Sequence, residues 1–293
     1  PALSAVIKAL TQPGDKVLIQ TPVYNHFFTS IHNSGCQAAE SPLVYRDNTY
    51  TIDFDDLERK AADPAVKLML LCNPHNPAGR VWTPAELHRI GELCLRHDVV
   101  VVADEIHCEL VMPGFRYTPF ASLCEEFERR SVTCTSPSKA FNLAGLQVAN
   151  IFAADAALRA RIGHSLQINE TGEIGPFAIE ALIAAYDEGA EWLDALNEYL
   201  HGNYRFSREY FDRNLPQYPV LPLEGTYLVW VDCRASGLTS DELETKLLEE
   251  AKLRINPGAI YGEAGRDFIR LNIACPRKLL AEGLDRLRKV LKR

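Results

Sequence analysis

The 293-residue chain lacks the hallmarks of several protein classes. No apolar run approaches the roughly 18 residues that a membrane-spanning helix needs, so we expect no membrane span. Lys and Arg number 31 against 39 Asp and Glu, and the net charge of −8 argues against nucleic acid as a partner, because phosphate binding needs a basic surface. We find no internal repeat or low-complexity segment in the sequence, and we expect no signal peptide. With 47% apolar and 24% charged residues, it is typical of an ordered globular protein.

The cysteines lack the spacing of a metal or disulfide site. None of the eight forms a C-x-x-C pair or a cluster at zinc-ligand spacing from histidine. Most stand in apolar stretches such as LMLLCN, GELCLRH and SVTCTS. We interpret them as small buried hydrophobic residues in a reducing compartment, and we predict no metal site and a cytoplasmic location.

The first half of the chain alternates strand and helix signals. Short apolar runs predict buried strands at KVLIQ, VKLMLLC, VVVVA and SVTCT. Between them, helices are predicted at VYNHFFTSIHNSG, ended by Gly35, and at TPAELHRIGELCLRH, where Thr83, Pro84 and Glu86 give a capping box with proline at the first helical position. Apolar strands that alternate with amphipathic helices are typical of a mostly parallel sheet covered on both faces. We therefore predict an α/β domain over residues 1–175.

The second half, residues 176–293, predicts a smaller α+β domain. A long helical stretch begins near residue 176 and is interrupted at Gly189. Strands are predicted at EGTYLVWVD, INPGAIYG and FIRLNIA, with a capped helix at TSDELETKLLEEA. The closing helix is predicted at RKLLAEGLDRLRKVLKR, whose basic residues we interpret as a solvated face and favourable charges near the helix C-terminus.

Reactive side chains follow four of the predicted strands. Ligands of such sheets bind at the carboxyl ends of the strands. An aromatic ring, an amide, a carboxylate with an imidazole, and a lysine with two hydroxyls stand there in chain order: Tyr24, Asn76, Asp104, His107, Ser136, Ser138 and Lys139. Together they could contact a flat, charged aromatic cofactor that carries a phosphate.

Each of these residues also has an ordinary structural interpretation. A lysine after a strand is usually a solvated charge, and Asp104 could simply cap the next helix. Tyr24 could be a packed ring, His107 a satisfied polar residue, and NPHNP a turn without a ligand. Only the combination in this chain order favours a shared site.

Four motifs, NPHNPAG, ADEIHCEL, SPSKAFNLAGLQVAN and FIRLNIACP, closely resemble those of class I and II aminotransferase-like enzymes, which are pyridoxal 5'-phosphate (PLP) enzymes of fold type I. DEIH and SKAFNLAGLQ are most similar to the cystathionine β-lyase, or C–S lyase, branch of MalY/PatB type. The resemblance extends over essentially the whole chain. It implies a large PLP-binding domain, a smaller C-terminal domain, and a homodimer, because active sites of this fold usually lie at a dimer interface.

The resemblance implies roles for the residues nearest the cofactor ring. Lys139 would hold PLP as a Schiff base, and its freed amine would move the Cα proton of an amino acid substrate. Asp104 would pair with the pyridine nitrogen and keep it protonated. Asn76 would hydrogen-bond the phenolic oxygen of the cofactor, and His107 would contact that oxygen or Asp104. Tyr24 would stack on the ring.

It also implies the phosphate and substrate contacts. Ser136 and Ser138 would bind phosphate oxygens, and Arg270 would take the substrate carboxylate in the bidentate manner of a guanidinium. Without the resemblance, Arg270 could be a surface charge at a strand edge.

Two features depart from the family pattern. Aminotransferases usually have an arginine for the phosphate eight residues after the lysine, and this chain has Gln147. Family members also begin well upstream of PALSAV, so we expect the N-terminal part of the family fold to be missing, including a glycine-containing turn that binds the cofactor phosphate.

Three functions remain open. The first is β-elimination from a sulfur amino acid such as cystathionine, which yields a thiol, pyruvate and ammonia. The second is transamination between an amino acid and a 2-oxo acid with the same residues. The third is a non-catalytic regulatory or interaction module, which predicts decay of the lysine or the aspartate. Gln147 and the DEIH motif favour the lyase.

Overall fold

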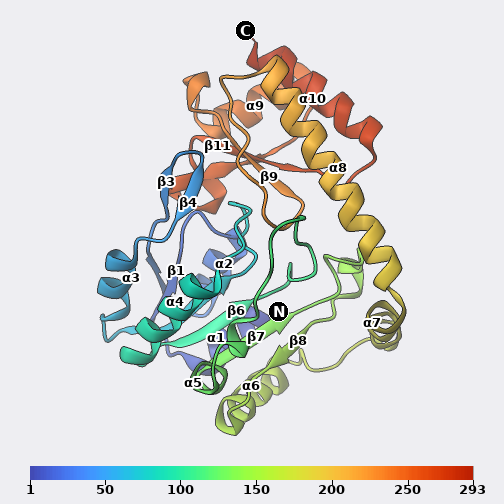
Figure 1. The fold of residues 1–293 in the computed structure, drawn as a ribbon. Coiled ribbons are helices and arrows are strands. Elements are labelled where there is room, and N and C mark those ends of the chain that lie inside the picture. The colour runs from blue at the N-terminus through green and yellow to red at the C-terminus, as the bar shows by residue number, and fades with distance from the viewer. Residues whose placement is uncertain (293) are drawn as a thin grey trace.

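The structure, a computed structural model, describes residues 1–292 and has a larger and a smaller part (Figure 1). The larger part is built on a six-stranded sheet of order β2-β1-β5-β6-β7-β8. Its strands are β1 (Lys16–Ile19), β2 (Gln37–Glu40), β5 (Val66–Cys72), β6 (Val100–Asp104), β7 (Ser131–Thr135) and β8 (Asn150–Phe152). All neighbours are parallel except β8, which runs antiparallel to β7. The mostly parallel sheet predicted from the apolar runs is therefore confirmed.

Helices cover both faces of this sheet. One core joins it to α1 (Ala2–Leu10), α2 (Asn25–Asn33) and α6 (Ala156–Ile168). The other core joins it to α3 (Phe54–Ala61), α4 (Pro84–Arg96) and α5 (Glu125–Arg129). Successive strand residues serve opposite faces, as the pleat requires: Leu18 belongs to the second core and Ile19 to the first.

Local signals place the helix ends as predicted. The Thr83 side chain accepts a hydrogen bond from the Glu86 amide at 3.2 Å, and the Glu86 carboxylate accepts one from the Thr83 amide at 2.8 Å. This capping box starts α4 with Pro84 at its first position. Helix α2 ends at Asn33, and Gly35 follows with a φ of +73°, a conformation that favours glycine.

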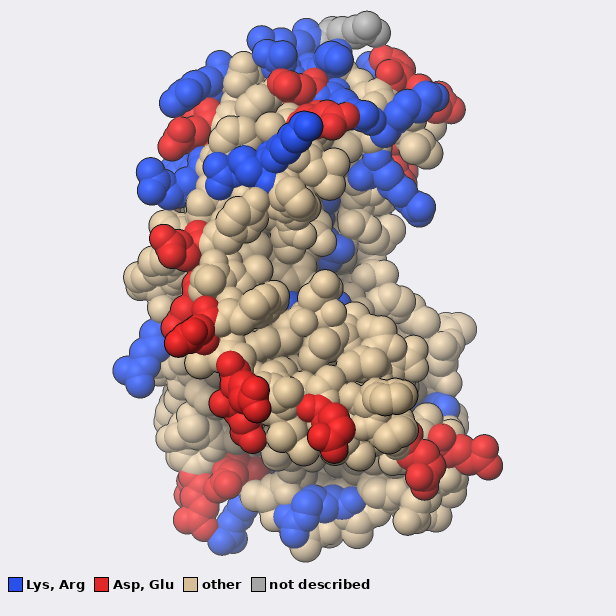
Figure 2. All heavy atoms as spheres, turned by 90° about the vertical axis from the view of Figure 1, so that its right-hand side faces the viewer, with Lys and Arg blue, Asp and Glu red and all other residues tan. Residues whose placement is uncertain are grey.

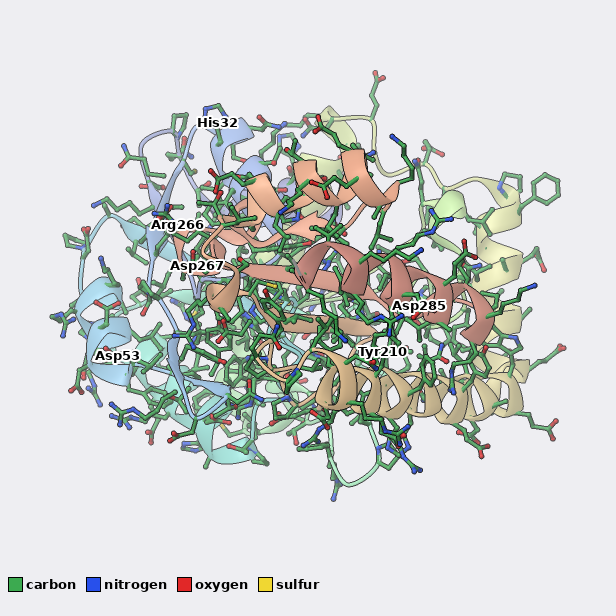
Figure 3. All side chains as sticks on the ribbon, turned by 90° about the horizontal axis from the view of Figure 1, so that it is seen from above. His32, Asp53, Tyr210, Arg266, Asp267 and Asp285 are labelled. Atoms are coloured by element: carbon green, nitrogen blue, oxygen red, sulfur yellow. The ribbon has the colours of Figure 1, made fainter. Side chains whose placement is uncertain are left out.

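The smaller part contains the sheet β10-β11-β9 and the C-terminal helices. Helix α7 (Pro176–Glu188) leads to the long α8 (Ala190–Asn214), and Gly189 separates them. The remaining elements are β9 (Leu228–Asp232), α9 (Ser240–Ala251), β10 (Asn256–Pro257), β11 (Phe268–Asn272) and α10 (Arg277–Leu291). Helices α8 and α10 lie side by side (Figure 3), and the Tyr210 hydroxyl on α8 donates to Asp285 on α10 at 2.6 Å.

One predicted strand is mostly wrong. Of INPGAIYG, only Asn256 and Pro257 pair with β11, and the chain then turns into a 3-10 helix, Gly258–Tyr261. The turn lies tightly against its surroundings, because a Cβ on Gly258 would come within 2.0 Å of the Gly265 carbonyl oxygen. Further 3-10 turns are Phe120–Ser122, Ala144–Leu146, Arg234–Ser236 and Glu263–Gly265.

The sequence patterns did not reveal the hairpin of β3 (Val44–Arg46) and β4 (Thr49–Thr51). Asp47 and Asn48 form its two-residue turn with φ values of 51° and 59°, and an Asp-Asn pair was the available signal. The Tyr45 hydroxyl donates to Asp232 at 3.1 Å, which ties the hairpin to the smaller part.

All eight cysteines are free thiols, and Cys36, Cys72, Cys94, Cys134 and Cys233 are buried. Over residues 1–292, none of the helices combines the length and the apolar character that crossing a membrane would require.

Candidate active site

The predicted site residues come together at one edge of the large sheet. Strands β1, β5, β6 and β7 are parallel neighbours, and Cys72, Asp104 and Cys134 lie side by side in register. The segments that leave their carboxyl ends therefore meet. They carry Tyr24, Asn76, Asp104, His107, Ser136, Ser138 and Lys139.

Asp104 is a buried carboxylate at the end of β6. One of its oxygens accepts a hydrogen bond from the Ile106 amide at 3.2 Å. Burial raises the pKa of Asp104 to about 6, and the positive charge of Lys139 opposes this rise. The half-buried Lys139 is therefore close enough for its positive charge to lower the pKa of Asp104. A cation placed against this carboxylate would return it to the charged form.

His107 is a buried imidazole that stays neutral. Burial lowers its pKa to about 3, with further lowering by the charges of Lys139 and Arg270. Its Nδ1 atom is buried without a hydrogen-bond partner among the described residues. Its ring packs in a T-shaped arrangement with that of Tyr227, with ring centroids 5.7 Å apart. His107 can therefore exchange a hydrogen bond with a bound group at neutral pH.

Arg270 brings the smaller part of the molecule into the site. It lies on β11, and its Nη1 donates to the Asn76 side-chain oxygen at 2.9 Å across 194 residues of sequence. Its Nη2 donates to Asn256 at 3.3 Å, and its Nε is buried without a partner among residues 1–292. The guanidinium is directed into the site rather than onto the surface.

Tyr24 and the two serines frame the rest of the site. Tyr24 precedes α2 and is half-buried, and burial, then the charge of Asp104, raises its pKa. The Ser136 hydroxyl donates to the Val148 carbonyl at 2.6 Å and accepts from the Ser138 amide at 3.1 Å. In this conformation Ser136 shapes the turn that carries Lys139, and a phosphate contact would require it to give up the bond to Val148.

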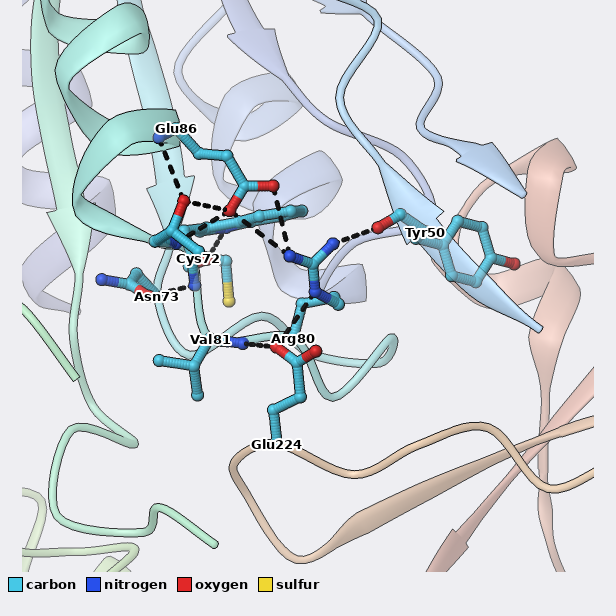
Figure 4. A network of polar contacts seen from close by, with 9 residues as sticks. Tyr50, Cys72, Asn73, Arg80, Val81, Glu86 and Glu224 are labelled. Atoms are coloured by element: carbon cyan, nitrogen blue, oxygen red, sulfur yellow. Dashed lines mark hydrogen bonds and ion pairs between the residues drawn. The ribbon is translucent and has the colours of Figure 1, made fainter. Parts of the chain in front are cut away.

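Sequence reasoning missed the network that holds the loop of Asn76 (Figure 4). Arg80 Nε donates to Glu224 at 3.0 Å, its Nη2 to Glu86 at 3.2 Å, and its Nη1 to the Tyr50 carbonyl. The Val81 amide also donates to Glu224, at 2.8 Å. An arginine after NPHNPAG gives no signal of this kind, because Glu224 is 144 residues away.

Two further buried polar residues were missed. His75 bonds the Pro22 carbonyl at 2.8 Å through Nε2, and burial lowers its pKa to about 4. Glu105 accepts hydrogen bonds from the Phe120 amide at 2.9 Å and from the Tyr117 hydroxyl. These contacts fix the loops on either side of Asn76 and Asp104.

The side chains present fit a cofactor such as PLP. A buried carboxylate with a raised pKa suits a cationic ring nitrogen, and a lysine close to it suits an aldehyde. A neutral imidazole and a guanidinium, each with an unpaired buried nitrogen, suit oxygen atoms of bound groups. Among residues 1–292, no group of three or more His, Cys, Asp or Glu side chains could hold a metal ion.

Comparison with known proteins agrees with this site. Residues 1–287 match the family described as aminotransferase class I and II. Cystathionine beta-lyase PatB of Bacillus subtilis is 43% identical over 290 residues, which cover 99% of this chain and 75% of PatB. Protein MalY of Escherichia coli is 35% identical, over 96% of this chain and 72% of MalY.

A solved structure shows the same architecture. Cystalysin of Treponema denticola, which contains a pyridoxal 5'-phosphate cofactor, superposes with a TM-score of 0.97 at 37% identity, over 100% of this chain and 74% of cystalysin. The chain therefore belongs to the class I and II aminotransferase family and has the fold type I architecture of its PLP-dependent enzymes.

Proposed function

We propose that this chain is a PLP-dependent C–S β-lyase that cleaves cystathionine or a related cysteine S-conjugate to a thiol, pyruvate and ammonia. The observation that carries the proposal is the buried Asp104 carboxylate beside the Lys139 amine, at a sheet edge that Arg270 closes from the smaller part. The similarity to cystathionine β-lyases favours sulfur amino acids as substrates.

Residues of this chain would bind PLP as follows. Lys139 would bond covalently to its aldehyde carbon, Asp104 would hold its ring nitrogen in the protonated form, and Asn76 or His107 would bond its phenolic oxygen. Tyr24 would pack on the ring. Ser136 and Ser138 would contact the phosphate.

When bound, PLP supplies an electron sink for negative charge at the substrate Cα. The chain supplies orientation and proton transfer. Arg270 would hold the α-carboxylate, with Asn76 bonded to it, and so present the Cα–H bond to Lys139. Once the substrate amine has displaced it, the Lys139 amine would take the Cα proton, and the Cβ–S bond would break with its electrons leaving on the thiolate. Water would then convert the remaining three-carbon fragment to pyruvate and ammonia.

Aminotransferase activity is the second candidate, since the same residues serve both reactions. The absence of an arginine at position 147 disfavours it: Gln147 stands there, exposed and with a φ of +55°. A non-catalytic module is disfavoured because Lys139 and Asp104 are both present and adjacent to one site.

The decisive test measures products and absorbance of the purified enzyme. With cystathionine we expect equal amounts of pyruvate and thiol, and Lys139→Ala should lower the rate at least roughly a thousandfold. The visible cofactor band should be lost on borohydride reduction and be absent from Lys139→Ala. Lys16→Ala is the matched control, since Lys16 pairs with Asp63 away from the site.

Conversion of an amino acid to its 2-oxo acid, dependent on an acceptor and without thiol release, would establish the aminotransferase instead. A protein that takes up no cofactor and turns over neither substrate would support the non-catalytic module.

We also propose a homodimer and a cytoplasmic location. Helix α7 exposes large apolar side chains, among them Phe177 at 81% exposure, Ile179, Ile183 and Tyr186. The face that carries α7 and α8 shows uncharged areas between separate acidic clusters (Figure 2), and the exposed apolar side chains of α7 support burial against a second copy. The free thiols support a reducing compartment.

We further propose that residues 1–175 form the large PLP-binding domain and that residues 176–293 form the linker helix and the small C-terminal domain.

A further inference from the structure

Arg270 is a partly buried cation without an anionic partner among residues 1–292. Its two terminal nitrogens are bonded to the neutral amide oxygens of Asn76 and Asn256, and burial lowers its pKa. Three tyrosines, Tyr261, Tyr227 and Tyr24, act to raise its pKa, and among residues 1–292 no carboxylate forms an ion pair with it. Buried charges normally need an opposite charge. Some other group must therefore stabilise this guanidinium.

The ring of Tyr261 supplies that stabilisation. The Arg270 guanidinium carbon lies 4.9 Å from the Tyr261 ring centroid. The face of an aromatic ring attracts a cation, and the attraction is strongest where water is excluded. Tyr261 is 0% exposed, so its ring is shielded from solvent, while Arg270 is only partly buried.

The ring itself is held in place by other aromatic residues. Trp230 meets Tyr261 edge-on at 5.6 Å and stacks on Phe268 at 5.3 Å with nearly parallel planes. The Trp230 indole also donates to the Tyr50 hydroxyl at 3.3 Å. Arg270 and Trp230 are register partners on β11 and β9, so the same strand pair positions both the cation and the support of the ring.

The backbone of Tyr261 is fixed as well. It ends the 3-10 turn that Gly258 begins, where close packing excludes a side chain. Its carbonyl accepts a hydrogen bond from the Val23 amide at 2.9 Å, next to Tyr24. The turn that replaced the predicted strand therefore links the smaller part to the edge of the large sheet.

We propose that Tyr261 is a positioning residue that holds the Arg270 guanidinium ready for the α-carboxylate of the substrate, in place of a carboxylate counter-ion. An Asp or Glu at this position would neutralise Arg270 and compete with the substrate. A ring face attracts the cation without occupying a donor, so the Nε–H and the second N–H of each terminal nitrogen can bind the incoming anion. This inference rests on the proposed function, because it takes Arg270 as the carboxylate-binding residue.

The test separates the ring from its hydroxyl. Tyr261→Phe keeps the ring face, and we expect its KM for cystathionine to stay within about threefold of wild type. Tyr261→Leu removes the face and should raise KM roughly tenfold to thirtyfold with little change in kcat, because carboxylate binding is shared by ground and transition states. Binding of propionate to the cofactor-free protein, measured by calorimetry, should weaken by a similar factor.

Phenylalanine with increasing ring fluorination at position 261 keeps the shape and weakens only the attraction to the cation. We expect log KM to rise steadily along this series. The series also tests the attraction between the ring and Arg270 if Tyr261→Leu does not fold. Phe206→Leu is the matched control, since it removes a ring 4.8 Å from Arg277, away from the site.

A KM that is flat along the fluorinated series would overturn the proposal, as would an equal loss in Tyr261→Phe and Tyr261→Leu. A wild-type enzyme that releases neither pyruvate nor thiol would instead contradict the proposed function. Propionate binding by the cofactor-free protein would still test Tyr261 in that case.

Discussion

Asp104 occupies a position where its own charge is unfavourable unless a cation lies against it. Burial is the main cause of its raised pKa, and the hydrogen bond from the Ile106 amide and the charge of Lys139 only partly offset that effect. Proteins retain such groups at sites that bind charged ligands, because the charge of the bound ligand offsets the loss of hydration. We therefore expect the charge of Asp104 to destabilise the cofactor-free protein and to favour binding of a cationic cofactor ring.

The pH dependence of stability tests whether the charged form of Asp104 destabilises the cofactor-free protein. A folded-state pKa of about 6, against 3.8 for an ordinary aspartate, means that the folded protein holds the proton more tightly than the unfolded chain. The free energy of unfolding of the cofactor-free protein should therefore fall by about 3 kcal/mol as the pH rises from about 4 to about 6. Urea unfolding across this range measures it.

Asp104→Asn should abolish this fall and make the cofactor-free protein more stable than wild type at pH 8, while it lowers lyase activity. Its amide oxygen can still accept the hydrogen bond from the Ile106 amide. Identical pH profiles for the variant and wild type would show that Asp104 is not the group that titrates.

At the scale of elements, the loop of Asn76 depends on one ion-pair network. Arg80 bridges Glu86 at the start of α4 and Glu224 in the segment before β9. All three side chains are largely buried, so removal of the arginine would leave two carboxylates without their partner. The loop position then depends on contacts between segments that are far apart in sequence.

Arg80→Met should lower the free energy of unfolding by about 3 kcal/mol, because breaking a buried pair leaves uncompensated charge. It should also lower kcat/KM, since Asn76 is bonded to Arg270. Denaturant unfolding and steady-state kinetics measure the two effects. Arg96→Met removes an exposed pair with Glu58 and should cost less than about 1 kcal/mol. Equal losses in both variants would contradict the assigned importance of the network.

Several elements could be predicted from local patterns alone. The capping box of α4 and the apolar run of β5 act over a few neighbouring residues, and both are found where the sequence placed them. INPGAIYG combines apolar residues typical of a strand with a Pro-Gly pair typical of a turn, and the chain forms a 3-10 helix from Gly258, which packs against Gly265. Propensity cannot reveal a contact of that kind.

At the scale of the whole molecule, exposed apolar side chains gather on α7, on a face where acidic clusters alternate with uncharged areas (Figure 2). Phe177, Ile179 and Ile183 expose apolar area there that is unfavourable in water. A second copy of the chain would remove this area from solvent.

Phe177→Asp should therefore shift the protein from dimer to monomer in analytical ultracentrifugation, because a buried charge at an interface opposes association. Leu279→Asp changes a similarly exposed apolar residue on α10 and should leave the dimer intact. Wild-type protein that sediments as a monomer, or a Phe177→Asp variant that remains dimeric, would contradict this assignment of the interface.

By itself, the sequence determined the alternation of the main strands and helices of the large sheet and the identity of the reactive side chains at the strand ends. Periodicity, caps and parallel connections are set by neighbouring residues, so Lys139 and Asp104 could be assigned to one sheet edge in advance. Only the tertiary structure decided that Arg270 meets Asn76 across 194 residues, that Tyr261 lies against its guanidinium, and that Arg80 joins Glu86 to Glu224. Contacts between distant segments depend on how the two cores pack, and no local pattern encodes that packing.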